Sequence, residues 1–141
     1  FSSMQDIAPS LALLPSFLEY FALAVVLTIA FSAIYVRVTP HREFALIRAN
    51  NLAAATSFSG ALLGFAIPLA SAIAHSVDLM DCAIWGLVAL IVQILVFFAA
   101  RLLIRDLPAR IERDERGAAI FAAALSVGVG LLNAACMTYQ P

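Results

Sequence analysis

The stretch LAAATSFSGALLGFAIPLASAIA, residues 52–74, contains no charged side chain and is long enough to cross a bilayer as one helix. A helix rises about 1.5 Å per residue, so about 20 residues cross a hydrocarbon core of about 30 Å. Three other apolar stretches meet this length: from Leu11 to Val36, from Cys82 to Ile104 and from Gly117 to Met137. Because backbone polar groups in lipid must pair within their own segment, the sequence predicts an all-α membrane protein with four transmembrane helices.

The composition of the whole chain agrees with this class. The 141 residues are 64% hydrophobic and 12% charged, with a mean hydropathy of +1.01. Soluble domains are roughly 45–50% apolar and about 25% charged. The composition excludes a soluble enzyme and a disulfide-stapled secreted domain. A net charge of −1 also gives no field that would attract nucleic acid.

The basic residues are sorted along the chain. All eight are arginines, and they lie in or beside the first and third connections: Arg37, Arg42, Arg48, Arg101, Arg105, Arg110, Arg113 and Arg116. Basic residues concentrate in cytoplasmic loops, so we expect these two connections in the cytoplasm and both termini on the periplasmic side. We expect one domain over residues 4–141, with residues 1–3 a cloning remnant before Met4.

The two halves of the chain resemble each other weakly. At an offset of 65 residues Tyr20 falls on Trp85 and Thr28 falls on Gln93. This predicts two parallel helical-hairpin repeats, over residues 11–74 and 82–137, related by an axis along the membrane normal. The alternative is that any two adjacent hairpins look this similar.

The arginine-bearing connections are predicted to be helical. Thr39 and Pro40 have the pattern of an N-cap and first helical residue, so the second long helix is expected to start there. The connections are either solvated helix ends or a cytoplasmic docking surface that could also contact anionic lipids. The candidate docking residues are Arg42, Arg48, Arg110, Arg113 and Arg116.

Small residues recur every three or four positions in the second and fourth spans. The stripe of the second span includes Gly60, Gly64 and Pro68, and that of the fourth includes Ser126 and Gly130. Small residues let helix backbones approach closely in lipid. We expect these two spans to be central and the first and third to face lipid; alternatively, the stripes flank a narrow path.

Few polar side chains lie at membrane depth. Thr28 and Gln93 are expected at equivalent depths, and Ser57 and Asn133 complete the set. Such groups either make interhelical hydrogen bonds or line a polar path, because an unpaired amide in lipid is costly. Pro68 frees a carbonyl one turn earlier, and the Asn133 amide is a candidate donor to it.

The connection between the second and third spans carries His75, Asp78 and Asp81, spaced by three. We interpret it as a solvated turn rather than a metal site. Cys82 and Cys136 fall at the outer ends of their spans and are expected to be buried free thiols, with a disulfide as the alternative. The sequence shows no nucleophile and base pair and no phosphate-binding loop, so we expect neither an enzyme nor a cofactor.

Several strings carry a family resemblance: TPHRE at 39–43, LIRANN at 46–51, IPLASA at 67–72 and NAACMT at 133–138. With them the chain resembles the YjfL-type bacterial inner-membrane proteins, a family defined as a domain of unknown function. The resemblance implies the plasma membrane, four spans and no established activity. It also implies, through genes that commonly neighbour this family, a link to envelope stress.

Two functional hypotheses follow. The first is a non-enzymatic membrane component of an envelope-stress system, which assembles as a homo-oligomer among membrane lipids and docks a cytoplasmic stress protein. The second is a small channel or transporter for an ion or small cation, with Thr28, Ser57, Gln93 and Asn133 along its path.

Overall fold

The computed structural model describes residues 9, 11–39 and 43–137. Within these residues four helices are long and apolar enough to cross a membrane: α2 (Leu14–Val38), α4 (Leu52–His75), α5 (Leu79–Leu103) and α7 (Arg116–Met137). The all-helical fold with four long apolar helices is therefore confirmed. Residues 1–3 and Arg42 lie outside the described residues.

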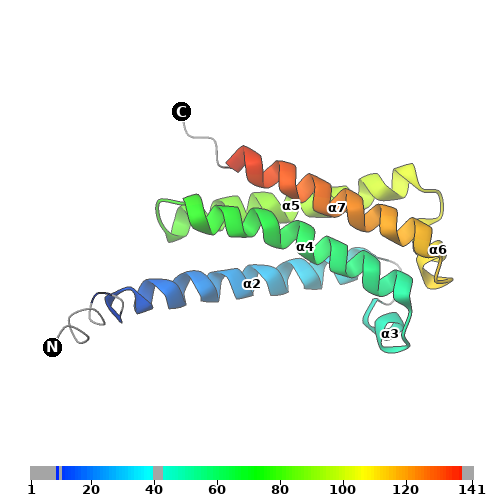
Figure 1. Cartoon of the computed structure of the whole chain (residues 1–141), viewed down its shortest axis with the longest axis horizontal. Coiled ribbons are helices and arrows are strands. Elements are labelled where there is room, and N and C mark those ends of the chain that lie inside the picture. Colours follow the sequence, from blue (N-terminus) through cyan, green and yellow to red (C-terminus); the bar gives the residue numbers. More distant parts are fainter. Residues whose placement is uncertain (1–8, 10, 40–42, 138–141) are drawn as a thin grey trace.

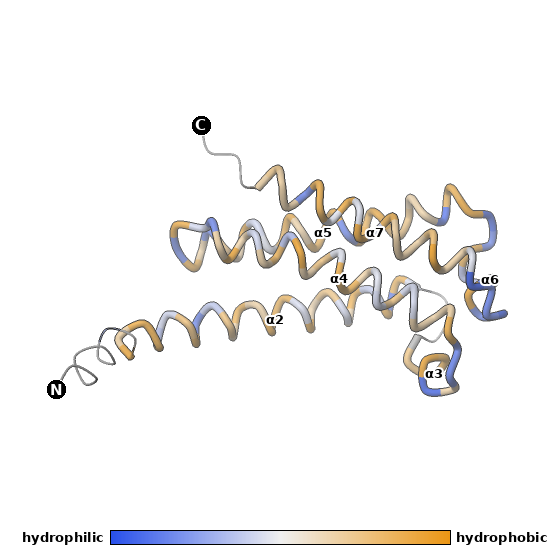
Figure 2. Tube along the Cα trace, in the orientation of Figure 1, coloured by the Kyte–Doolittle hydropathy of each residue, from blue (hydrophilic) through white to orange (hydrophobic). Residues whose placement is uncertain are grey.

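Two short helices complete the described fold: α3 (Glu43–Arg48) and α6 (Leu107–Glu112). They lie together at one end of the bundle, and α2 begins and α7 ends at the opposite end (Figure 1). Hydrophilic residues gather around α3 and α6 and in the turn between α4 and α5, while the long helices are mainly hydrophobic with a few polar residues (Figure 2). Most of the polar surface of the described residues therefore lies at the two ends of the bundle.

The most extensive contact is between α4 and α7, and α5 packs against both. The expectation that α5 mainly faces lipid is wrong. Its stripe of Cys82, Gly86, Ala89, Gln93, Phe97 and Ala100 is buried. Conversely, α7 buries one face and exposes Ile120, Phe121, Leu131 and Leu132 on the rest. In the sequence, the large apolar residues of α5 made its buried stripe, which has helical spacing, hard to recognise.

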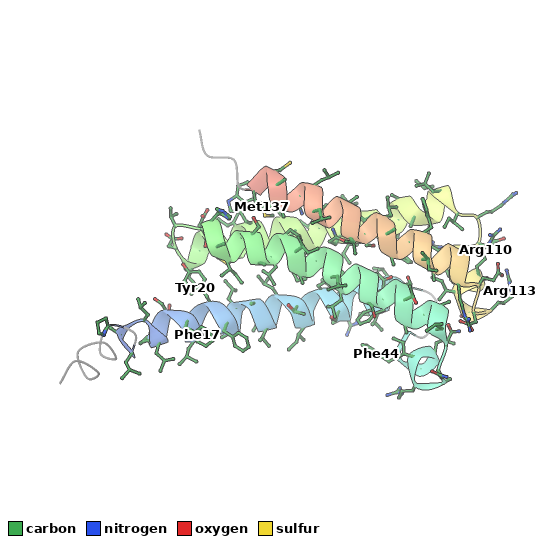
Figure 3. All side chains as sticks on the ribbon, viewed as in Figure 1. Phe17, Tyr20, Phe44, Arg110, Arg113 and Met137 are labelled. Carbon is green, nitrogen blue, oxygen red and sulfur yellow. The ribbon has the colours of Figure 1, made fainter. Side chains whose placement is uncertain are left out.

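An aromatic cluster attaches α2 to the bundle. The rings of Phe31 and Phe65 stack with centroids 4.7 Å apart. Tyr35 lies 5.6 Å from Phe58 and 5.4 Å from Phe97, measured between ring centroids. These contacts involve the second half of α2 only. Its first half is separated from α4 by an open apolar groove of about 330 Å³, whose lining includes Phe17 and Tyr20 (Figure 3).

The short helices α3 and α6 end in the same way. In α3 the left-handed residue is Asn50, with φ of 66°, and the Asn51 N–H donates to the Leu46 carbonyl at 2.9 Å. In α6 the left-handed residue is Asp114, with φ of 60°, and the Glu115 N–H donates to the Arg110 carbonyl at 2.9 Å. Both ends are Schellman motifs, in which Asn and Asp tolerate the left-handed conformation.

The second long helix does not start at Thr39, as expected, because the Schellman motif at Asn50 interrupts it. Thr39 ends α2, with its N–H donating to the Tyr35 carbonyl at 3.0 Å. Pro40 lies outside the described residues. The helix α4 begins only at Leu52, after the left-handed Asn50 has turned the chain. The single long helix expected from Thr39 onward is thus divided into a short helix, a turn and a membrane span.

Side chains from the two connections tie them together. Asn51 accepts from the Ala54 N–H at 2.8 Å as the N-cap of α4, and its Nδ2 donates to the carbonyls of Ile111 at 3.1 Å and Glu112 at 3.2 Å. Asp114 accepts from the Ala53 N–H at 2.8 Å. The exposed N–H groups at the start of α4 and the last carbonyls of α6 are thereby paired. Both connections become one rigid end of the bundle.

We predict that Asp114→Ala destabilises the protein by about 2 kcal/mol, because it removes a helix cap and places alanine in a left-handed conformation. Asp114→Asn keeps the acceptor and tolerates that conformation, so its loss should stay below about 0.5 kcal/mol. Denaturant titration of the purified protein in mixed micelles measures both values. Equal losses in the two variants would contradict the capping role.

Candidate functional site

The centre of the bundle is a contact between the backbones of α4 and α7. A Cβ atom added at Gly60 would collide with Ala123, and one at Gly64 would collide with the Ser126 carbonyl. A Cβ atom at Gly130 would collide with the Gly64 carbonyl. The small-residue stripes therefore meet each other, and glycine is required at these positions because backbone atoms leave no room for a side chain.

Pro68 leaves the Gly64 carbonyl without its usual hydrogen-bond partner. Proline has no N–H, so the carbonyl four residues earlier has no partner within its own helix. The structure places the Cα of Gly130 against this oxygen. A Cα–H group so placed can donate a weak hydrogen bond to the carbonyl. The expected donor, Asn133, is not the partner: its Nδ2 is buried without a hydrogen bond among the described residues.

Gln93 lies where α4, α5 and α7 meet. Its side chain is 2% exposed, and neither Oε1 nor Nε2 has a hydrogen-bond partner in the described part of the chain. Oε1 lies 2.7 Å from the position that a Cβ atom would take at Gly64. An unpaired amide in this setting costs free energy, so Gln93 is the most conspicuous polar group in the core.

The other polar residues do not join Gln93. Thr28 donates locally to the Ala24 carbonyl at 2.8 Å. Leu27 lies against Gly86, which precedes Gln93 on α5 by about two turns. We expected Thr28 and Gln93 at equivalent depths, but the structure places them at different depths.

Ser57 and Asn133 also lie apart from Gln93. Ser57 is buried on α4, about two turns from Gly64 toward the arginine-bearing end, and Asn133 is about two turns from Ser126 toward the other end. The interhelical hydrogen bond is made by Ser71, whose Oγ donates to the Ala134 carbonyl at 3.1 Å. The four candidate residues do not line one path.

The described arginines of the two connections gather at one end. Arg110 and Arg113 project beside each other at α6 (Figure 3). Arg113 pairs with Glu115 at 2.8 Å, and Arg116 lies 3.5 Å from Asp114, with both arginine side chains more than half exposed. Arg48 is exposed on α3. Exposed pairs contribute little stability, so these guanidinium groups remain accessible to a partner.

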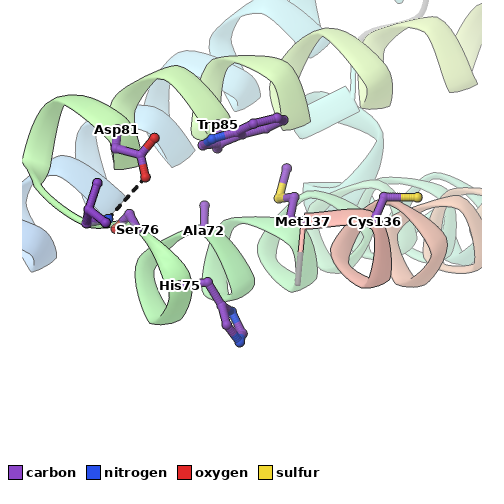
Figure 4. Close-up of a pocket in the computed structure, with 8 residues that line it drawn as sticks. Ala72, His75, Ser76, Asp81, Trp85, Cys136 and Met137 are labelled. Atoms are coloured by element: carbon purple, nitrogen blue, oxygen red, sulfur yellow. Dashed lines mark hydrogen bonds between the residues drawn. The ribbon is translucent and has the colours of Figure 1, made fainter. Parts of the chain in front are cut away.

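The opposite end contains a cavity of about 360 Å³ between α4, α5 and α7. Its lining includes Asp81 and Trp85 of α5, Met137 of α7 and His75 of α4 (Figure 4). Asp78 caps α5 by accepting from the Asp81 N–H at 2.8 Å, and Asp81 Oδ2 accepts from the Val77 N–H at 3.1 Å. No cluster of three or more metal-ligating side chains occurs among the described residues.

Both cysteines are free. Cys82 is buried, as expected, whereas Cys136 is exposed rather than buried and is among the residues that line the cavity (Figure 4).

Sequence reasoning missed the roles of Asn51, Asp114 and Trp85. Asn51 had a detectable signal, since Asn before an apolar run is a typical N-cap. Asp114 bonds to a residue 61 positions earlier, and Trp85 shares the cavity with Met137 of another helix, so spacing in the chain does not reveal these contacts.

Four apolar spans with polar chemistry at the ends define a multi-pass helical membrane protein. The family model described as Domain of Unknown Function (DUF350) matches residues 9–137, and the chain belongs to this family. The protein described as UPF0719 inner membrane protein YjfL of Escherichia coli K12 is 42% identical over 124 residues, covering 88% of this chain and 94% of that protein. UPF0719 transmembrane protein YshE of Bacillus subtilis is 25% identical over 118 residues, covering 82% and 88%. No solved structure matches the chain.

We predict that Gly130→Ala destabilises the protein by about 1–3 kcal/mol, because the added methyl group forces α7 away from the Gly64 carbonyl. Gly128 is the matched control on the same helix, since nothing lies within 4 Å of its Cβ position. Gly128→Ala should be neutral or slightly stabilising, as alanine is the better helix former. Mixed-micelle unfolding compares the two. Similar effects in both variants would show that helix propensity, not close approach, determines the result.

We predict that Gln93→Leu stabilises the protein by about 1 kcal/mol or leaves its stability unchanged, because it removes an unpaired buried amide with little change in volume. Gln93→Glu should be strongly destabilising, since it adds a charge at the same place. The measurement is again unfolding in mixed micelles. A clear loss of stability in Gln93→Leu would mean that the amide has a partner in the folded protein.

Proposed function

We propose that this protein is a non-enzymatic component of an envelope-stress system in the bacterial inner membrane. It works as an oligomer and docks a cytoplasmic stress protein through its arginine-bearing end. The observation that carries the proposal is the tie between the two connections through Asn51 and Asp114. The envelope-stress assignment itself rests on the family resemblance, and the docking role rests on this surface.

The tied connections favour a docking surface over two solvated helix ends. Hydrogen bonds hold α3 and α6 in one arrangement, so a partner would lose little conformational freedom of the surface on binding. Arg48, Arg113 and Arg116 are exposed, and Arg110 is half-buried. Each guanidinium group can form two parallel hydrogen bonds with a carboxylate. An acidic helix or loop is therefore the partner chemistry that this surface suits.

The weak attachment of α2 supports assembly. The first half of α2 touches little of its own chain, and the groove beside it is apolar. Lipid and another protein helix can both cover such a face, and helices associate in lipid through packing rather than through hydrophobic burial. We place the contact between copies along the first half of α2 and its groove.

Orientation follows from the charges. The arginines lie at one end of the bundle, and the positive-inside rule assigns that end to the cytoplasm. The start of α2 and the end of α7 lie at the other end (Figure 1). The proposal therefore puts both ends of the chain in the periplasm.

We also propose that the two halves are repeats. The bounds of α5 follow those of α2 by 65 residues, and those of α6 follow α3 by 64. The two Schellman motifs share their hydrogen-bond pattern at the offset of 64. The arrangement departs from a simple twofold, because α5 packs on α4 and α7 whereas α2 packs on α4 and α5.

The alternative function is a small channel or transporter. The unpaired amide of Gln93 in the core is the observation that favours it. The backbone contact of α4 with α7 beside it opposes a path within one copy, because glycine backbones occupy the space that an ion would need.

For the docking proposal we predict that Arg110→Glu with Arg113→Glu abolishes partner capture by in-membrane crosslinking and leaves oligomeric state and stability unchanged. The charge reversal turns attraction for a carboxylate into repulsion. Arg101→Glu with Arg105→Glu is the matched control, since it changes the same charge outside the tied surface. A monomeric protein, together with partners captured undiminished by the first variant, would contradict the proposal.

A flux measurement in proteoliposomes distinguishes the channel or transporter from the docking proposal. A conduit predicts flux of ions or small cations that is lost in Gln93→Leu, a variant expected to fold. Flux that depends on Gln93 would replace the docking proposal; the absence of flux from a folded, oligomeric sample would remove the conduit.

A further inference from the structure

We propose that the cavity at the arginine-free end is a binding site for a small organic cation, one ammonium group carried on a compact apolar body. The cavity measures about 360 Å³, within the range of about 300–1,000 Å³ typical of small-molecule sites. The inference does not rest on the proposed docking function, since it concerns the opposite end of the molecule.

Two side chains of α5 form the recognition wall. Asp81 and Trp85 are four residues apart and therefore lie on the same face of the helix. The Asp81 carboxylate is fixed by the Val77 N–H, which donates to its Oδ2 at 3.1 Å. Figure 4 shows the Trp85 ring lying flat over the cavity beside this carboxylate. An ammonium group between them would meet a negative charge on one side and an aromatic face on the other.

The rest of the lining accommodates an apolar body. Met137 extends from α7 toward Trp85, and Ala72 forms the floor on α4 (Figure 4). Methionine is flexible and polarisable, so it adapts to ligands of differing shape. These apolar neighbours make the site unsuited to a bare metal ion, which would need several oxygen ligands.

The charges around the cavity select a cation. The arginines of the chain lie in or beside the connections at the other end, and the chain contains no lysine. His75 lines the cavity, but its Nδ1 is held at 2.9 Å by the Ser71 carbonyl and its ring points away from Asp81 (Figure 4). Asp78 adds a second acidic group in the same turn. An anion would find no positive partner on this wall.

A tryptophan at this depth also anchors a helix at the interface between lipid and water. Interface anchoring alone would not require a carboxylate one turn earlier or a cavity beneath the ring. A carboxylate and an aromatic face on one open cavity distinguish a binding site from an anchor, and the test is designed around that difference.

The test uses Trp85 as its own reporter, because it is the only tryptophan in the chain. The purified protein in detergent is titrated with choline chloride, and the intrinsic fluorescence is recorded against sodium chloride at equal ionic strength. The neutral isostere 3,3-dimethyl-1-butanol has the same shape without the charge. We expect a saturable change with choline and a response at least about tenfold weaker with the alcohol, which corresponds to about 1.4 kcal/mol.

Asp81→Asn removes the charge and keeps an acceptor for the Val77 N–H. It should weaken choline binding about tenfold, again about 1.4 kcal/mol. Asp78→Asn is the matched control: it removes a charge from the same turn outside the cavity lining, and asparagine remains a good helix cap. Its binding should stay within about twofold of the parent. Gel filtration and circular dichroism establish that both variants fold.

A third variant keeps the proposal testable if Asp81→Asn fails to fold. Trp85→Phe retains an apolar wall with a weaker aromatic face, and titration calorimetry should show weaker choline binding. The proposal is overturned by any of three results: no saturable change up to about 50 mM choline, a concentration well above millimolar affinity; equal responses to choline and the alcohol; or equal loss of binding in Asp81→Asn and Asp78→Asn.

Discussion

The contact between the Gly64 carbonyl and the backbone of Gly130 determines how the rest of the bundle is arranged. Pro68 leaves that oxygen without a partner in its own helix, and lipid offers none. Only a glycine on α7 lets a Cα–H group come close enough to face it. Once α4 and α7 are this close, α5 lies in the angle between them with Gln93 against Gly64. The helix α2 packs outside this core through its aromatic residues.

Length and hydropathy were sufficient to predict four spans, because the thickness of the hydrocarbon core sets the length of a span and its apolar interior sets the hydropathy. They could not predict which faces are buried, since lipid and protein core are equally apolar. The small-residue stripes located the contact of α4 with α7, and the same spacing on α5 at Gly86 and Ala89 was overlooked among larger residues. The partner of the Gly64 carbonyl was assigned to Asn133, a stronger donor, although close packing favours the backbone of Gly130.

Chemistry in this protein is located at the two ends, and each end is built differently. At the arginine-bearing end, side chains bond to backbone groups of the neighbouring connection and hold the two connections together. At the other end, three helices leave a hollow lined by Asp81, Trp85 and Met137. The sorting of the charges could be predicted from the sequence, whereas the bonds between the connections and the cavity depend on residues distant in the chain.

The separation of the contacting residues along the chain bears on how the protein is made. Ser71 and Ala134, which bond across the central contact, are 63 residues apart. During synthesis α4 therefore enters the bilayer well before its partner helix exists. For that interval the Gly64 carbonyl is exposed to lipid or must be sheltered by the insertion machinery. Because α7 is translated after α4, the contact between them forms only once α7 has entered the bilayer.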